Sequence, residues 1–257
     1  MRVTVCELPQ EPVALAAAWA GLCRHVSRHG SELVLLPEFA LVDAVWEAER
    51  FDAARWEEAV AQGDALLERL PKLGAERVVG TRPTSEQGRR FNEGYLWSKD
   101  DGLAPLRRKY FLPEEPGGWE AAWFDRGDAG FPAYRSRGLR FGLNICTELW
   151  ALESYAAYAA RGVQVILSPR ATAATTMAKW FAAGVVAAVR SGAFSLSSNR
   201  VDPTGACGGA GWIIGPEGEV LARTSPGAPW VTVDIDLASQ AAGQNGYPRY
   251  VLGSGRG

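Results

Sequence analysis

A chain of 257 residues with 47% hydrophobic and 22% charged side chains is long enough to bury a substantial core. Its formal net charge of -2 offers no basic surface for nucleic acid, and its apolar runs are too short to span a bilayer. The start of the chain lacks the features of a secretory signal and the cysteines are widely separated, so a reducing cytoplasm is the expected compartment.

Strand and helix patterns alternate along the first half of the chain. "RVTVCEL" (2–8) is typical of a strand, and the Ala-rich stretch 12–30, which closes on a glycine, is typical of an amphipathic helix. "ELVLLPEF" (32–39) is continuously apolar, as expected for a strand buried on both faces. Next we expect a helix near 53–72, a strand at 76–83 and a hairpin over 91–110 that turns at Asp101-Gly102.

After a loop rich in Pro, Gly and Trp, the second half repeats the alternation. "LRFGLNIC" (139–146) has apolar residues at alternate positions and predicts a strand, followed by a helix from about 148 to 161. A strand at 163–169, a helix at 178–192 and strands at 193–199, 211–222 and 230–237 complete the pattern. Because no linker or repeat divides the chain, we expect one mixed α/β domain over residues 1–257, with sheets covered by helices.

Three of the predicted strands end in polar groups beside a proline or a helix start. They end at Glu38, at Cys146 and Thr147, and at Ser168 to Arg170. Ligands in α/β proteins bind outside the carboxyl ends of strands, where loops converge on a rigid frame. The three ends are therefore candidates for one pocket, although strands also finish in polar turns without any function.

Cys146 has two interpretations. Free cysteine is among the most buried residue types, which favours inert packing. Strand parity, however, groups Cys146 with the polar positions of its strand rather than the apolar ones. At a helix N-terminus its thiol would have a lowered pKa, and the N–H of Thr147 would point at a developing oxyanion. These features favour a nucleophile.

A nucleophilic cysteine needs a base. The chain has two histidines, His25 and His29, both on one early helix, and together with Cys23 they make a weak metal pattern that is more typical of a solvated helix end. Glu38 is the better candidate base, since burial after Pro37 would raise the pKa of its carboxyl. Its alternative role is an acid near a helix start.

Lys109, in "RRKYFLPEEP", follows the second strand of the hairpin. Beside two arginines it would ordinarily be part of a solvated basic surface. In a pocket, its ammonium would supply fixed positive charge where an oxyanion develops.

Glu38 in "LVLLPEF", Lys109 in "RRKYFLPEE" and Cys146 in "GLNICTELW" resemble the three signature blocks of the nitrilase (carbon–nitrogen hydrolase) superfamily, in the same order. Supporting similarities are Asn92, "WFDRGD", "ILSPRAT" and "GGAGWIIGPEGEVL". The resemblance implies a four-layer αββα sandwich, a Glu–Lys–Cys triad and a homodimer or higher homo-oligomer.

The resemblance also implies a second glutamate between the lysine and the cysteine. Glu120, in "GGWEAAWFDRGD", has the matching context, and Glu114 and Glu115 are alternatives nearer Lys109. The chain departs from familiar members at Thr147, where many carry an aromatic residue, and at Arg170, where smaller or amide side chains are frequent. These departures leave the substrate open.

The expected function is hydrolysis of a small carboxamide to ammonia and a carboxylic acid through a cysteine thioester, without metal or cofactor. A nitrilase, an acyltransferase and a non-catalytic scaffold of the same fold remain alternatives. Arg170 would pair with a substrate carboxylate or with a structural acid. Trp150 and Trp180 would line the pocket, unless they are core residues.

Overall fold

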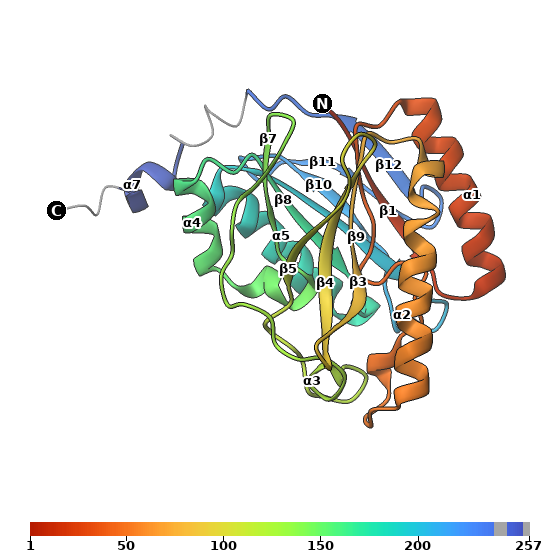
Figure 1. Cartoon of the computed structure of the whole chain (residues 1–257). Coiled ribbons are helices and arrows are strands. Elements are labelled where there is room, and N and C mark those ends of the chain that lie inside the picture. The colour runs from red at the N-terminus through yellow and green to blue at the C-terminus, as the bar shows by residue number, and fades with distance from the viewer. Residues whose placement is uncertain (239–245, 254–257) are drawn as a thin grey trace.

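The computed structural model of the chain describes residues 1–238 and 246–253 (Figure 1). The described residues form an α/β fold in which a curled mixed sheet of 12 strands is covered by helices. The strands are β1 (Arg2–Pro9), β2 (Leu33–Leu35), β3 (Arg77–Glu86), β4 (Arg89–Ser98), β5 (Gly102–Arg108), β6 (Tyr134–Ser136), β7 (Leu139–Leu143), β8 (Val165–Arg170), β9 (Phe194–Val201), β10 (Trp212–Ile214), β11 (Val220–Arg223) and β12 (Trp230–Asp234).

The helices connect these strands. The α-helices are α1 (Pro12–His29), α2 (Ala53–Leu67), α3 (Glu120–Trp123), α4 (Glu153–Ala160), α5 (Met177–Ser191) and α7 (Arg249–Gly253). Short 3-10 helices are η1 (Val45–Glu47), η2 (Leu70–Leu73), η3 (Cys146–Trp150) and η4 (Ala174–Thr176).

Strand β1 joins the two halves of the sheet. Its first part, Val3–Val5, pairs in parallel with β2, and its last part, Glu7–Pro9, pairs in parallel with β9. The main strand order is β5-β4-β3-β2-β1-β9-β8-β7-β6, with β10 and β11 continuing from β9 and β12 pairing with β1. Strands β1 and β9 lie between β2 and β8 in this order, yet the carboxyl ends of β2 and β8 are joined by a hydrogen bond from the Glu38 N–H to the Arg170 carbonyl.

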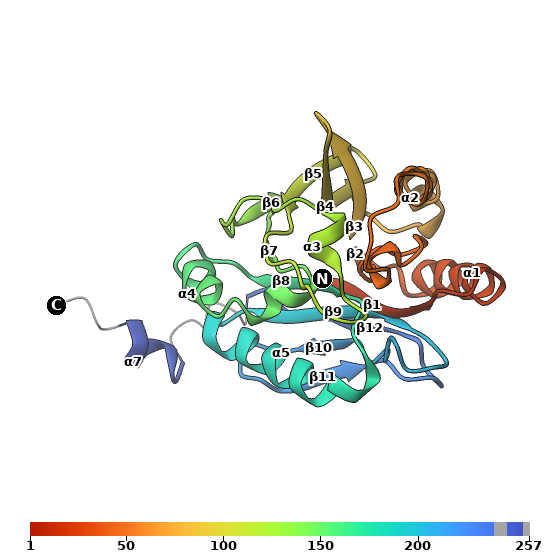
Figure 2. The same ribbon diagram turned by 90° about the horizontal axis from the view of Figure 1, so that it is seen from below.

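Of the four apolar clusters among the described residues, three hold the sheet and its covering helices together. One combines strand residues of both halves, such as Val5, Leu35, Leu143 and Leu167. The second packs α1 and η2 on β1–β3, and the third packs α4 and α5 on β8 and β10. Figure 2 shows α1 and α2 on one flank of the strands and α4 and α5 on another. Burial on both faces explains the continuous apolar runs of β2 and β8.

Most predicted elements are confirmed, and the differences are informative. The helix predicted near 53–72 ends at Leu67, and a 3-10 turn follows because Pro71 cannot continue an α-helix. The strand predicted at 32–39 is limited to Leu33–Leu35. The strand predicted at 139–146 stops at Leu143. The Asn144 backbone N–H still donates to the Leu167 carbonyl of β8 at 3.0 Å, and the Asn144 side chain donates to the Glu148 carbonyl and Ser154 Oγ in the turn that follows.

The helix predicted from 148 to 161 is divided. A 3-10 turn, η3, begins at Cys146, and α4 begins only at Glu153. Cys146 therefore occupies a tight turn of its own between strand and helix.

Candidate active site

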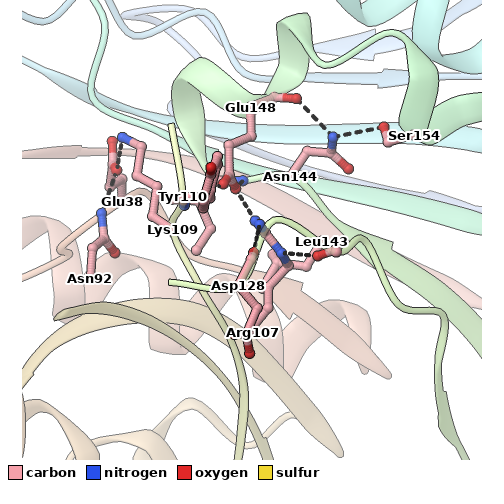
Figure 3. A network of polar contacts seen from close by, with 12 residues as sticks. Glu38, Asn92, Arg107, Lys109, Tyr110, Asp128, Leu143, Asn144, Glu148 and Ser154 are labelled. Atoms are coloured by element: carbon pink, nitrogen blue, oxygen red, sulfur yellow. Dashed lines mark hydrogen bonds and ion pairs between the residues drawn. The ribbon is translucent and has the colours of Figure 1, made fainter. Parts of the chain in front are cut away.

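Glu38 leaves β2 in a buried position between two other chain segments. Its backbone N–H donates to the carbonyl of Arg170 at 3.2 Å, which joins the ends of β2 and β8. Its side chain is nearly inaccessible, and its Oε1 accepts hydrogen bonds from Asn92 Nδ2 at 2.8 Å and Lys109 Nζ at 2.9 Å (Figure 3). The first predicted strand end thus meets the hairpin of β4 and β5.

Lys109 follows β5 and is fully buried. Its backbone N–H donates to the Asn92 carbonyl, and its Nζ donates to Glu38 Oε1 at 2.9 Å and Glu120 Oε1 at 2.7 Å. Burial by itself would lower the pKa of Lys109, but the carboxylates of Glu120 and Glu38 outweigh it and raise the pKa. The ammonium is therefore held charged between two acids.

Glu120, the first residue of α3, is the glutamate that reaches Lys109. Glu114 and Glu115 are both exposed instead. Burial raises the pKa of Glu120 to about 7, although the charge of Lys109 opposes the shift. Its second oxygen, Oε2, is buried and has no hydrogen-bond partner among residues 1–238 and 246–253. That oxygen therefore has unused capacity to accept a hydrogen bond.

Cys146 begins η3 with the left-handed backbone angle φ 48°, which side-chain-bearing residues seldom adopt. The charges of Glu38, Lys109 and Glu120 all act on its thiol, and the N–H of Ala171 donates to its sulfur. The structure therefore brings the nucleophile candidate to the acid–lysine cluster.

Two expectations about Cys146 are wrong. Burial, followed by the carboxylate of Glu38, raises the pKa of the thiol well above its usual value, whereas the helix start was expected to lower it. A five-residue 3-10 turn has too small a dipole to overcome burial. Strand parity was expected to place Cys146 with the polar positions of its strand. Instead β7 ends at Leu143, and the thiol packs with the apolar cluster.

A cavity of about 510 Å³ opens onto this cluster. Cys146 and Glu120 lie in its wall, together with Thr147, Trp180, Glu47 and Glu115. The N–H of Thr147 donates to no group in the described part of the chain. An oxygen held beside Cys146 would find that N–H and the Lys109 ammonium nearby.

The other predicted binding residues divide between the pocket and its surroundings. Trp180 lines the cavity, and its Nε1 donates to Thr176 at 3.1 Å. Trp150 lies outside the lining with 45% of its surface exposed, and its ring is 5.7 Å from that of Trp180. The structure therefore brings one of the two tryptophans to the cavity.

Arg170 is fully buried and also lies outside the cavity lining. Its guanidinium donates to Ser197 Oγ at 2.7 Å, Thr172 Oγ1 at 2.7 Å and the Ala210 carbonyl at 3.0 Å, and it stacks over Trp212. Burial lowers the pKa of Arg170 to about 9. Among the described residues the Arg170 guanidinium forms no ion pair with a carboxylate, and its donors meet neutral oxygens instead.

Sequence reasoning missed Glu148, which is fully buried beside the cluster and pairs with Arg107. Its position two residues after Cys146 was the only available signal, because a buried acid and an exposed one look alike in a single sequence. It also missed Glu47 and Cys207 in the cavity wall, since the short 3-10 helix η1 and the loop after β9 have no recognisable sequence pattern.

The histidine pair lies on α1, away from the cavity. The rings of His25 and His29 stack at 4.1 Å, and His25 Nε2 bonds Thr232 Oγ1. Burial lowers the pKa of His25 to about 4. Within residues 1–238 and 246–253, three or more His, Cys, Asp or Glu side chains nowhere gather as a metal site would require. In that same part of the chain, every helix is too short or too polar to cross a bilayer.

Known proteins resemble this chain over different lengths. N-carbamoylputrescine amidase from Oryza sativa subsp. japonica is 27% identical over 154 residues, which cover 58% of this chain and 50% of that protein. Citrullinase from Francisella tularensis is 24% identical over 149 residues, covering 56% and 51%. The chain thus spans about half the length of these two relatives. An omega-amidase from Bos taurus is 27% identical over 232 residues, covering 86% and 82%.

Solved structures share the fold. A carbon–nitrogen hydrolase from Helicobacter pylori G27 superposes with a TM-score of 0.83 at 22% identity, covering 100% of this chain and 95% of that one. An amidase from Nesterenkonia sp. AN1 gives 0.76 at 21% identity, covering 98% of both chains. The family model for carbon–nitrogen hydrolases matches residues 2–243. The resemblance in the signature blocks is thereby confirmed, and the chain belongs to the carbon–nitrogen hydrolase family of the nitrilase superfamily.

Proposed function

We propose that this protein is an amidase that hydrolyses a small carboxamide to ammonia and a carboxylic acid through a thioester on Cys146. One observation carries the proposal: the buried Lys109 ammonium lies 2.9 Å from Glu38 and 2.7 Å from Glu120, and their charges act on a thiol in a cavity wall. A buried acid, base and thiol in one place is typical of an acyl-transfer site.

The raised pKa of Cys146 fits a resting thiol that loses its proton only during attack. Glu38 takes that proton as the sulfur bonds to the amide carbon. The tetrahedral oxyanion is stabilised by the Lys109 ammonium and the Thr147 N–H. Glu38 then returns the proton to the leaving nitrogen, the C–N bond breaks, and ammonia departs.

Water completes the cycle. Glu38 takes a proton from water as the oxygen attacks the thioester carbon, and the C–S bond breaks with the proton returning to sulfur. Glu120 holds Lys109 through Oε1, and its unpartnered Oε2 accepts an N–H of the substrate amide. Acid–base work and oxyanion binding are thus divided between Glu38 and Lys109.

The cavity wall indicates which end groups the amide carries. Glu47 and Glu115 are exposed carboxylates in the lining, whereas Arg170 and Arg200 are buried outside it. Trp180 offers an aromatic face nearby. A carboxamide with a neutral or positively charged far end therefore suits the cavity better than one with a carboxylate.

Other features accompany the proposed activity. We infer a single-domain enzyme of the reducing cytoplasm that assembles as a homodimer or larger homo-oligomer. The four cysteines are free, which suits that compartment. The shared cluster of Val5, Leu35, Leu143 and Leu167 supports two sheet halves packed face to face in an αββα sandwich.

A matched panel of carboxamides and nitriles, bearing ammonium, neutral or carboxylate ends, tests the function by ammonia release. We expect carboxamides to be hydrolysed, and Cys146→Ala to abolish turnover while Cys23→Ala, which alters a half-buried thiol on α1, retains it. Activity on nitriles alone would make the enzyme a nitrilase. Acyl transfer to added hydroxylamine in place of hydrolysis would make it an acyltransferase.

Mass spectrometry of the trapped enzyme gives an independent reading. In a mutant of the Nesterenkonia amidase, acrylamide has added to the active-site cysteine. We expect a small electrophile to label Cys146 ahead of Cys6, Cys23 and Cys207. Equal labelling of all four thiols would contradict an activated Cys146 and favour a non-catalytic scaffold.

A further inference from the structure

Glu148 lies between the lysine and the cysteine without touching the cavity. The side chain is fully buried. Figure 3 shows its carboxylate beside Tyr110 and Arg107, and its Oε1 accepts the backbone N–H of Tyr110 at 2.8 Å. Its Oε2 accepts the backbone N–H of Ile145 at 3.0 Å. One carboxylate therefore binds the residue after Lys109 and the residue before Cys146.

The lysine side of this bridge is fixed by Arg107. The Arg107 Nη1 forms an ion pair and a hydrogen bond with Glu148 Oε2. The remaining donors of the guanidinium contact the carbonyls of Gly130 at 3.2 Å and Asp128 at 3.3 Å, and the group stacks 4.3 Å above the Phe131 ring. Because the arginine is held from several directions, it fixes the carboxylate relative to β5.

The cysteine side is equally constrained. The N–H of Glu148 donates to the Ile145 carbonyl at 3.0 Å, and Asn144 Nδ2 donates to the Glu148 carbonyl at 2.8 Å and to Ser154 Oγ at 3.1 Å. These bonds surround the left-handed Cys146, a conformation that needs support from neighbouring structure. The turn and the carboxylate thus behave as one unit.

We propose that Glu148 is a positioning residue that sets the separation between the Lys109 ammonium and the Cys146 thiol by linking the segments on which they stand. Lys109 and Cys146 come from different halves of the sheet, and the proposed chemistry requires them at one carbonyl group. This inference rests on the proposed function. In this proposal Glu148 holds the catalytic groups in place and does not itself contact substrate.

A buried ion pair that serves stability alone is the competing explanation, and two variants separate them. Glu148→Gln keeps the size of the side chain but replaces one acceptor oxygen by a donor. Glu148→Asp keeps the charge that faces Arg107 but is one methylene shorter, so it cannot reach both N–H groups. If acceptance of both backbone N–H groups matters, both variants lose activity. If only the charge that faces Arg107 matters, the aspartate variant keeps its activity.

For the best carboxamide of the panel, we expect kcat to fall about 10- to 100-fold in both variants, with KM within about threefold of wild type. A displaced reacting group weakens the transition state more than the bound ground state. Glu93→Gln is the matched control, since Glu93 is also buried and ion-paired, with Arg108, and takes no part in the proposed reaction.

The pH dependence of Cys146 alkylation by chloroacetamide gives a readout that stability would not move. The Lys109 ammonium lowers the pKa of the thiol, so its displacement would shift the profile to higher pH. Loss of the Glu148 charge without displacement would shift the profile to lower pH, because one negative charge has gone. We expect the upward shift in Glu148→Gln and in Glu148→Asp.

A folded Glu148→Gln or Glu148→Asp enzyme with unchanged kcat and an unmoved or downward-shifted profile overturns the proposal. So does a Glu93→Gln enzyme with the same kcat loss. Where the glutamine variant does not fold, the aspartate variant, which preserves the charge pair, decides. Turnover that survives Cys146→Ala would instead overturn the proposed function, and alkylation needs no turnover, so the two failures are distinguishable.

Discussion

Lys109 and Arg170 are two fully buried cations near the same strand ends, and their surroundings differ in kind. Lys109 contacts two carboxylates, whereas the guanidinium of Arg170 contacts the neutral oxygens of Ser197, Thr172 and Ala210. The pKa of Lys109 is accordingly raised by its acidic partners, and that of Arg170 is lowered to about 9 by burial.

The comparison teaches that a buried charge has to be interpreted through its partners. Around Lys109, two acids and an ammonium form a charged cluster that opens on a cavity, an arrangement suited to moving protons. Around Arg170, neutral dipoles and an indole ring hold the end of β8 in place, an arrangement suited to structure. Each region can be tested by removing its cation.

The largest effect is expected for Lys109→Met, which removes the cation from the acidic cluster. Glu38 and Glu120 would then face each other without a counter-charge, at a cost of about 3–5 kcal/mol in the free energy of unfolding. We expect kcat to fall by about 10³-fold or more, since such groups act as a unit. Ammonia release and urea unfolding measure the two quantities.

The exposed Lys99, in the turn between β4 and β5, provides the matched control for that change. Lys99→Met should leave kcat and unfolding within error of wild type. If Lys109→Met retained activity within tenfold, the contrast between the two buried cations would lose its catalytic meaning.

Replacing Arg170, the structural cation of the two, should lower stability rather than activity, and by less than the Lys109 change does. Arg170→Met removes three hydrogen bonds to buried oxygens, and we expect the free energy of unfolding to fall by about 1–4 kcal/mol. Because the Arg170 backbone, which accepts from Glu38, is retained, kcat should stay within about tenfold. A kcat loss equal to that of Lys109→Met, with stability unchanged, would reassign Arg170 to catalysis.

Part of the fold and of the site could be predicted from the sequence alone. Period and turn signals locate β1, α1, the hairpin at Asp101-Gly102 and α5, because these elements depend on local patterns. The signature blocks pointed to Glu38, Lys109 and Cys146, whose segments the structure brings together.

What the sequence could not supply is the identity of partners distant along the chain. Arg170 and Lys109 are equivalent as basic residues beyond strand ends, and only folding places Glu120 beside one and Ser197 beside the other. The prediction of a lowered pKa for Cys146 failed for the same reason, because the burial that raises this pKa depends on all the residues packed around the thiol. Glu148 was missed because its two backbone partners come from separate segments.

The free energy of unfolding should depend on pH through Glu120 in the acidic cluster. Burial raises the pKa of Glu120 to about 7, so the folded state holds the proton more tightly than the unfolded chain does. The contribution to stability is fully present below the usual glutamate range and is lost as pH rises through about 7. Glu120→Gln cannot titrate and lacks this loss.

We therefore expect the unfolding free energy of wild type, relative to Glu120→Gln, to decline by up to about 3 kcal/mol between pH 4.5 and 7. Urea unfolding at a series of pH values measures the difference. A difference that stays flat or rises with pH across this window would show that Lys109 outweighs burial at Glu120.

The smallest effects are expected at the two tryptophans, which extend the comparison to the cavity wall. Trp180 lines the cavity, whereas Trp150 is 45% exposed and lies outside the lining, with its ring 5.7 Å from that of Trp180. Loss of apolar contact worth about 1 kcal/mol should raise KM about fivefold in Trp180→Ala, with kcat nearly unchanged. In Trp150→Ala, both constants should stay within about twofold. Steady-state kinetics on one carboxamide measures kcat and KM for both variants. If KM changes more in Trp150→Ala than in Trp180→Ala, substrate binds on the exposed side of the tryptophan pair rather than beside Cys146.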